Sequence, residues 1–270
     1  MAPSQDAARS GSTAGQGIDR RVLLAAAGFT VLGLVIYLVG LPTLFGRGTD
    51  AMVFDTELGD LSLPTALFVA LAGTAVSAAL LTRANWRVVD IVVASVLGVA
   101  GGLLFAVWNA GWEGVSKAVP PPASALLVGV WLLPAVLGGL VLRKPGAAVY
   151  TELVAAVLSA LIGSVWGFSV VWYGIVEGLG AEAVFALLLY RKFGAVTATL
   201  AGIGAGVTTG LMDSLLYYPA TSAGFKVTYV VFAVVSGGVI AGLGAWGLTR
   251  ALARTGALAP LASGRVAERV

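Results

Sequence analysis

Long runs of uncharged, apolar residues constrain the fold of this chain more than any other sequence feature. Such runs cover residues 22–46, 61–82, 91–112, 118–142 and 227–249. At about 1.5 Å per residue in a helix, each run is long enough to cross a hydrocarbon layer about 30 Å thick. Only 11% of the residues are charged, against about 25% in soluble domains. The sequence therefore predicts an all-α polytopic membrane protein.

A further apolar stretch, residues 145–190, is too long for a single crossing. The run GSVWG at 163–167 supplies a break, which predicts helices near 147–164 and 169–190. Residues 194–217 predict one more helix. Together with the five uncharged runs, these segments give an expected total of eight transmembrane helices.

The positions of Lys and Arg predict how these helices are oriented. With eight crossings both termini lie on one side, and that side carries all of the 16 Lys and Arg residues except Arg47, Lys117 and Lys226. Cytoplasmic loops of membrane proteins carry an excess of Lys and Arg, so we expect both termini in the cytoplasm. A basic inner face also explains the pI of about 9.3 without nucleic-acid binding.

Two residue types are missing, which excludes several kinds of chemistry. The sequence has no Cys and no His. Disulfides, thiolate or imidazole metal sites, and Ser-His or Cys-His catalysis are therefore excluded. We expect no metal, no cofactor and no catalytic residues.

Four carboxylates lie inside the predicted helices, namely Glu152, Glu177, Glu182 and Asp213. A carboxylate at a helix centre costs about 2.5–3.5 kcal/mol on insertion scales, so it usually faces a cavity or a partner. Glu177 and Glu182 are five residues apart, about 140° around an α-helix. They therefore face different directions, and Tyr173, one turn before Glu177, shares the face of Glu177.

Glu177 is the first candidate to contact a ligand, either through an exocyclic amine or by balancing a cationic ring. Asp213, with Tyr217 one turn further on, is the second. Glu152 and Glu182 are also candidate site residues. For these two, the alternative is a buried polar clamp that pairs with Ser, Thr, Arg143 or Arg191 or shares a proton.

Aromatic residues gather near the expected outer ends of the helices. The tryptophans there are Trp108, Trp112, Trp131, Trp166 and Trp172, and the tyrosines are Tyr173, Tyr217, Tyr218 and Tyr229. An aromatic belt at the headgroup level is one interpretation. A belt should occupy both faces, yet only Trp86 and Trp246 lie near the inner one. We therefore expect Trp108, Trp112, Trp131, Trp172, Tyr173 and Tyr217 to help bind a flat or cationic heterocycle.

Several motifs from Trp86 onward resemble a known family. They are WRVVDIVVAS at 86–95, LRKPGAAVYTELVAA at 142–156 and GIVEGLGAEAVFALLLYRK at 174–192. Their order is similar to the YkoE-type S components of energy-coupling-factor (ECF) vitamin transporters. The chain departs from the family pattern where Glu177 replaces the Gln of a QGLGAE motif.

The resemblance implies a six-helix S-component core at 85–252. A two-helix membrane extension at 21–84 precedes it, and cytoplasmic tails at 1–20 and 253–270 flank the whole. Such a subunit of a bacterial plasma membrane captures a vitamin from outside, here thiamine or its hydroxymethylpyrimidine (HMP) precursor. It then docks on a membrane T component driven by cytosolic ATPases.

The resemblance also implies a docking stripe for the T component, made of Ala94, Gly98 and Gly102. Packing within the chain is the alternative, because small residues let any two helices approach closely. Gly202, Gly206 and Gly210 show the same spacing.

Other functions stay open at this stage. An S component could bind another vitamin or small heterocycle. A stand-alone ion or proton carrier could use the same four carboxylates, and a membrane-embedded enzyme could use two of them on a lipid-soluble substrate. The carboxylates do not form a paired motif, which disfavours the enzyme.

Overall fold

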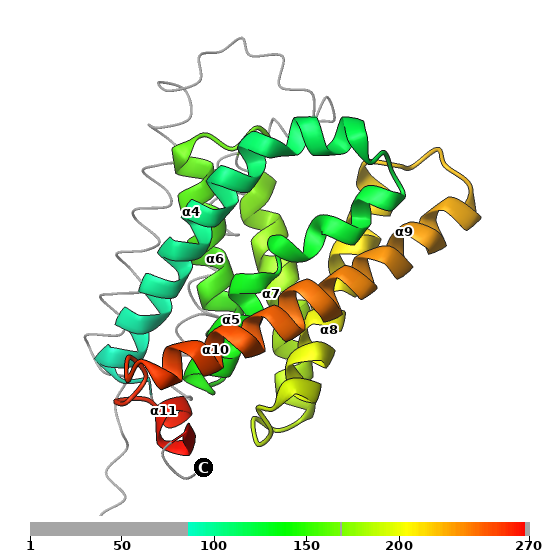
Figure 1. Ribbon diagram of the computed structural model, residues 1–270. Helices are drawn as coiled ribbons and strands as arrows, with labels where there is room; N and C mark the ends of the chain where they lie inside the picture. The colour runs from blue at the N-terminus through cyan, green and yellow to red at the C-terminus, as the bar shows by residue number, and fades with distance from the viewer. Residues whose placement is uncertain (1–85, 168, 268–270) are drawn as a thin grey trace, which may run out of the picture. The chain divides into compact units, whose positions relative to one another are not determined.

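The computed structural model describes residues 86–167 and 169–267, and every regular element in that part of the chain is a helix (Figure 1). The elements are α4 (Val88–Ala118), η3 (Ala123–Val130), α5 (Leu133–Leu142), α6 (Ala147–Ile162), α7 (Ser169–Leu187), α8 (Ala195–Leu216), α9 (Ala223–Ser236), η4 (Gly237–Leu243), α10 (Gly244–Arg254) and α11 (Ala262–Ala267). The predicted helical class is confirmed for these residues. The predicted helices at 22–46 and 61–82 lie outside the described residues.

Five helical segments of the described chain are long and apolar enough to cross a membrane. They are Val88–Ala118, Ala123–Leu142, Ser169–Leu187, Ala195–Leu216 and Ala223–Arg254. The apolar helix α6 is shorter, with 16 residues. These six segments overlap the six ranges expected for the core, and the boundary that the sequence placed at 163–167 falls between α6 and α7.

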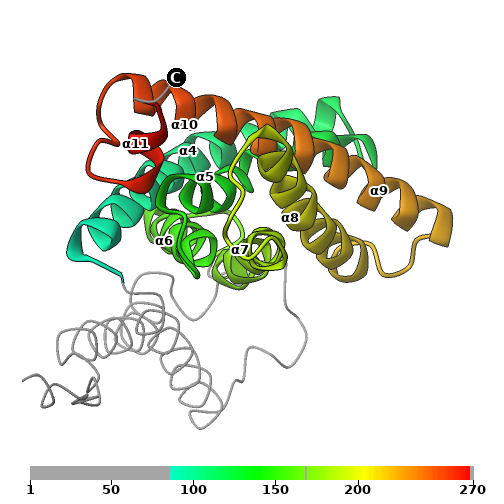
Figure 2. The same ribbon diagram turned by 90° about the horizontal axis from the view of Figure 1, so that it is seen from below.

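Helix α5 is the central element of the described bundle (Figure 2). It contacts α4, α6, α7, α8, η4 and α10. Neighbouring pairs around it are α4 with α6, α6 with α7, α7 with α8, and α8 with α9 and η4. The segment Ala123–Leu142 is consequently the most buried of the five spanning segments, with 72% of its apolar window inside the bundle.

Residues at helix ends explain where the central helices stop. Helix α5 ends at Leu142, and the next residue, Arg143, adopts a left-handed φ of 56°. Pro145, a residue that cannot continue a helix, follows. Helix α6 lies between two glycines, Gly146 and Gly163, whose φ angles are 83° and 107°. Glycine adopts this region without steric cost, so both ends of α6 are fixed by the local sequence.

The small-residue stripe of α4 packs against α6. Ala94 has no exposed surface. A Cβ atom on Gly98 would lie 2.6 Å from Val154 Cβ, and one on Gly102 would lie 2.7 Å from Leu158 Cβ. In the described residues the stripe therefore serves the alternative role, packing within the chain. Its role in docking stays a prediction.

Ion pairs tie together the end of the bundle at which α4 begins. The buried carboxylate of Asp90 accepts hydrogen bonds from the Arg87 guanidinium, at 2.9 and 3.2 Å, and from the Lys144 ammonium. The Trp86 indole donates to the carbonyl of Pro145 at 3.0 Å. The start of α4 is thus bound to the α5–α6 turn, and the cavity described next lies at the opposite end of these helices.

Candidate ligand-binding site

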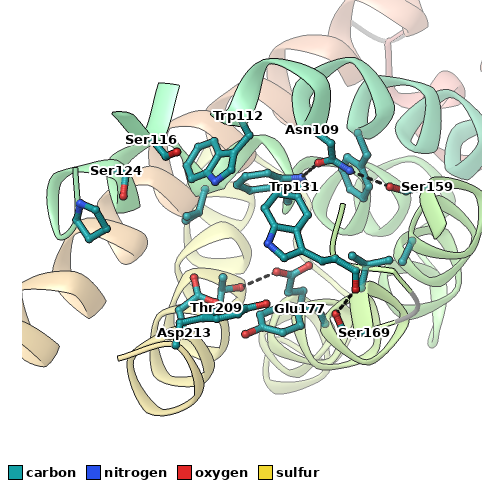
Figure 3. A pocket seen from close by; sticks show the side chains of 18 of the residues that line it. Asn109, Trp112, Ser116, Ser124, Trp131, Ser159, Ser169, Glu177, Thr209 and Asp213 are labelled. Atoms are coloured by element: carbon teal, nitrogen blue, oxygen red, sulfur yellow. Dashed lines mark hydrogen bonds between the residues drawn. The ribbon is translucent and has the colours of Figure 1, made fainter. Parts of the chain in front are cut away.

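A cavity of about 400 Å³ lies at the end of the bundle where α4, α6 and α8 finish and where α7 and α9 begin (Figure 3). Side chains from these five helices and from the η3–α5 segment line it. Small-molecule sites typically enclose about 300–1,000 Å³. The cavity therefore has the size of a site for a vitamin-sized ligand.

Two carboxylates, Glu177 of α7 and Asp213 of α8, form its acidic wall. Only 5% of Glu177 and 8% of Asp213 is exposed. The Tyr229 hydroxyl donates to Asp213 Oδ2 at 2.8 Å. Because neither carboxylate has a cationic partner among the described residues, both can accept hydrogen bonds from a ligand or balance a cationic one.

Glu177 is held by one shared hydroxyl group. Thr209 Oγ1 lies 3.1 Å from Glu177 Oε1 and 3.0 Å from the carbonyl oxygen of Ala205. A hydroxyl has a single proton to donate, so Thr209 cannot satisfy both acceptors fully. Glu177 therefore keeps acceptor capacity for a ligand.

Aromatic rings form the wall that faces the acids. Trp112 and Trp131 meet edge to face with centroids 4.6 Å apart, and Trp166 meets Trp131 at 5.6 Å. Nearer the acids, the rings of Tyr173 and Tyr217 stack at 6.1 Å. Burial, followed by the Asp213 carboxylate, raises the pKa of Tyr217 to about 12, so this phenol stays neutral. Such rings suit a flat heterocycle or a cation.

A chain of hydrogen bonds orients the central indole. Trp131 Nε1 donates to Asn109 Oδ1 at 2.8 Å, and Asn109 Nδ2 donates to Ser159 Oγ at 3.1 Å (Figure 3). Asn109 and Ser159 both line the cavity. With Thr209, they are lining residues that the sequence reasoning missed. A signal existed for Asn109, which is one of two Asn in the chain and lies inside an apolar helix.

Six of the ten predicted site residues line the cavity, namely Glu177, Asp213, Tyr173, Tyr217, Trp112 and Trp131. Two other aromatic candidates lie elsewhere. The Trp108 ring packs behind the wall, 6.1 Å from Trp112 and 6.2 Å from Trp131. Trp172 is 48% exposed on α7. Three further aromatic residues line the cavity, namely Trp166, Tyr218 and Tyr229. The sequence placed them near the outer helix ends but not among the predicted site residues.

The two other acids bind the N-termini of helices instead. Glu152 Oε2 accepts the Ala135 N–H of α5 at 2.7 Å. The carboxylate of Glu182 accepts the N–H groups of Gly146 and Ala148, at 2.7 and 2.9 Å, where α6 begins. These donors belong to the backbone groups that have no partner within their own helix. The arrangement corresponds to the buried-clamp alternative, with backbone N–H groups as partners in place of Ser, Thr or Arg.

The acidic and aromatic cavity at one end of the described helices is suited to binding a small molecule. Comparisons with known proteins show the family to which the chain belongs. Residues 89–208 match the family of the ABC-type cobalt transport system, permease component. The chain is 32% identical over 182 residues to YkoE of Bacillus subtilis (strain 168), which is provisionally named an HMP/thiamine permease protein. That alignment covers 67% of this chain and 92% of YkoE.

A solved structure of an S-component of an ECF transporter is also similar, with a TM-score of 0.66 and 31% identity. The match covers 68% of this chain and 94% of that one. The chain therefore belongs to the YkoE-type S components of ECF transporters, as its motifs predicted. It is a multi-pass plasma-membrane protein that acts as a substrate-binding subunit in transport, and its relatives are not enzymes.

Proposed function

We propose that this subunit captures thiamine or HMP from the outer side of the membrane. It then delivers the ligand through a T component driven by cytosolic ATPases. The observation that carries the proposal is the pairing of Glu177 and Asp213 in one buried cavity opposite an indole wall. The name of the Bacillus subtilis relative supports the ligand class.

The chemistry of both ligands suits this cavity. Each contains an aminopyrimidine, a flat ring whose exocyclic amine donates hydrogen bonds. Glu177 is placed to accept from that amine, since its one hydroxyl partner is shared. The ring can lie against Trp112, Trp131 and Trp166, and the thiazolium cation of thiamine is attracted to indole faces.

The positions of basic residues support an outward-facing cavity. Arg143 and Lys144 follow α5, and Arg250 lies in α10, all at the bundle end opposite the cavity. An excess of Lys and Arg is typical of the cytoplasmic side, so we place that end, and both termini, in the cytoplasm. The T-component contact is part of the proposal. If it uses Ala94, Gly98 and Gly102, α4 must move away from α6, because these residues are buried there.

Ligand binding to the purified full chain in detergent tests the proposal. We expect the wild type to bind thiamine or HMP with submicromolar Kd. Asp213→Asn should weaken binding about tenfold or more, because a hydrogen bond to a charged group is worth about 1.5–3 kcal/mol. Glu177→Ala should do the same, since it removes the acceptor, whereas Gln is the residue of the family motif at this position. Glu113→Gln is the matched control, since Glu113 is 82% exposed, pairs with Lys117 and is not among the residues that line the cavity.

Other outcomes would select the alternative functions. A chain that ignores both compounds but binds another heterocycle would be an S component of different specificity. Uptake of labelled vitamin by the chain alone in vesicles, driven by a pH gradient, would indicate a stand-alone carrier. Under our proposal the chain alone retains the ligand but does not accumulate it.

A further inference from the structure

A second cavity adjoins the first between α4 and α6. It has a volume of about 90 Å³, and Ala106, Ile162 and Ser164 contribute to its lining. Asn109 and Ser159 line both cavities. This pair of side chains, which one hydrogen bond of 3.1 Å joins, therefore lies where the two spaces meet, and we call the pair the partition.

The partition is built to hold one orientation of Asn109. Its carbonyl oxygen accepts from the Trp131 indole at 2.8 Å, so its amide nitrogen faces Ser159. Asn109 is only 7% exposed and Ser159 only 2%. The polar atoms around the second cavity are neutral, because its described lining contains no Lys, Arg, Asp or Glu. An entering group would meet one amide donor and hydroxyls that can donate or accept.

We propose that the second cavity is a subsite for an uncharged, hydroxyl-bearing arm of the ligand. This inference rests on the proposed function. A hydroxyl inserted between Asn109 and Ser159 accepts from the amide and donates to Ser159 Oγ. The partition can thus open without leaving a buried polar group unpaired. An anionic arm would find no cation there.

The two expected ligands differ in length, so we expect them to differ in whether they reach the second cavity. HMP is a single ring with a short hydroxymethyl group, which the main cavity can hold by itself. Thiamine has a second ring that ends in a hydroxyethyl arm. With its aminopyrimidine at Glu177 and its cation beside Trp131, that arm points toward Asn109, the hydrogen-bond partner of Trp131. We infer that thiamine uses both cavities and HMP uses one.

Filling the second cavity tests the inference on the full chain. Ala106 lines only the second cavity, so Ala106→Leu should weaken thiamine binding about tenfold and leave HMP binding unchanged. The matched control is Ala100→Leu, an exposed position of the same helix. Unchanged HMP binding also shows that the variant is folded. Equal losses for both ligands, or no loss for thiamine, would overturn the inference.

A second variant tests the hydrogen bond itself. The wild type should prefer thiamine over its analogue with an ethyl group in place of hydroxyethyl by about five- to tenfold, the value of one buried hydrogen bond. Ser159→Ala should remove this preference. No preference in the wild type, or a preference that survives in the variant, would overturn the subsite while leaving the proposed function intact. A wild type that binds neither thiamine nor HMP would overturn both.

Discussion

Replacing Glu182 with Gln should destabilise the protein without touching the ligand cavity. Oε1 of Glu182 accepts from the Gly146 N–H and the Tyr190 hydroxyl, both at 2.7 Å. Oε2 accepts from the N–H groups of Ala148 and Val149, at 2.9 and 3.4 Å. Gly146, the residue that precedes α6, has no side chain to cap the helix. Glu182 therefore supplies the cap from another helix.

The size of the effect follows from counting acceptors. Gln has one acceptor oxygen, so in either orientation its NH₂ group faces at least one backbone N–H donor. The cheaper orientation turns the NH₂ toward Gly146 and Tyr190, because the Tyr190 hydroxyl can rotate and accept, and only the Gly146 N–H then loses its partner. A buried donor without a partner costs about 1–3 kcal/mol, so we expect a loss of about 2–3 kcal/mol. For a chain of this size the midpoint of thermal unfolding should fall by about 5–10 °C.

The assay is thermal unfolding in detergent, followed by intrinsic tryptophan fluorescence, with Glu113→Gln as control. Ligand binding at a temperature well below the transition should be the same in Glu182→Gln and wild type. A midpoint within about 2 °C of wild type would refute the capping role. Loss of ligand binding in a variant of normal stability would return Glu182 to the ligand site.

Two further predictions concern packing and pH. Gly98→Leu should separate α4 from α6, because even its Cβ would lie 2.6 Å from Val154 Cβ. We expect the free energy of unfolding to fall by about 3 kcal/mol or more, which the thermal unfolding assay would show as a lower midpoint. Burial, together with the Glu182 carboxylate, raises the pKa of Tyr190, which follows α7. Unfolded Tyr190 releases its proton above about pH 10 while the folded residue keeps it, so stability should fall as pH rises beyond 10. Tyr190→Phe should show a smaller fall between pH 8 and 10.5 than wild type, measured by the same unfolding assay.

The sequence could predict the helices and part of the cavity because both depend on local patterns. Uncharged runs set the helix ranges, and the four-residue spacing of Tyr173 and Glu177 put both on one face. Both line the cavity. Trp172 shows that the position of a residue along a helix does not by itself predict whether its side chain lines the cavity. It lies next to Tyr173, about 100° around the helix, so the two side chains cannot face the same space.

The roles of Glu152 and Glu182 could not be read from local patterns. Each binds backbone N–H groups 17 to 36 residues away in sequence, and only the packing of α6 against α5 and of α7 against α6 brings those groups near. Neutral polar residues were missed for a different reason. Ser and Thr inside helices often bond to carbonyls of their own helix, as Thr209 does with Ala205. Their presence in an apolar run therefore says little about a ligand.

The four acids that the sequence placed inside helices, Glu152, Glu177, Glu182 and Asp213, fall into two groups according to what donates to them. Glu152 and Glu182 accept backbone N–H groups, which cannot turn away and would stay buried without a partner. Glu177 and Asp213 accept side-chain hydroxyls, from Thr209 and Tyr229. A hydroxyl can rotate toward another acceptor when a ligand arrives. The first two acids are thus committed to holding the helix ends in place, while the second two can exchange their partners for a ligand at little cost.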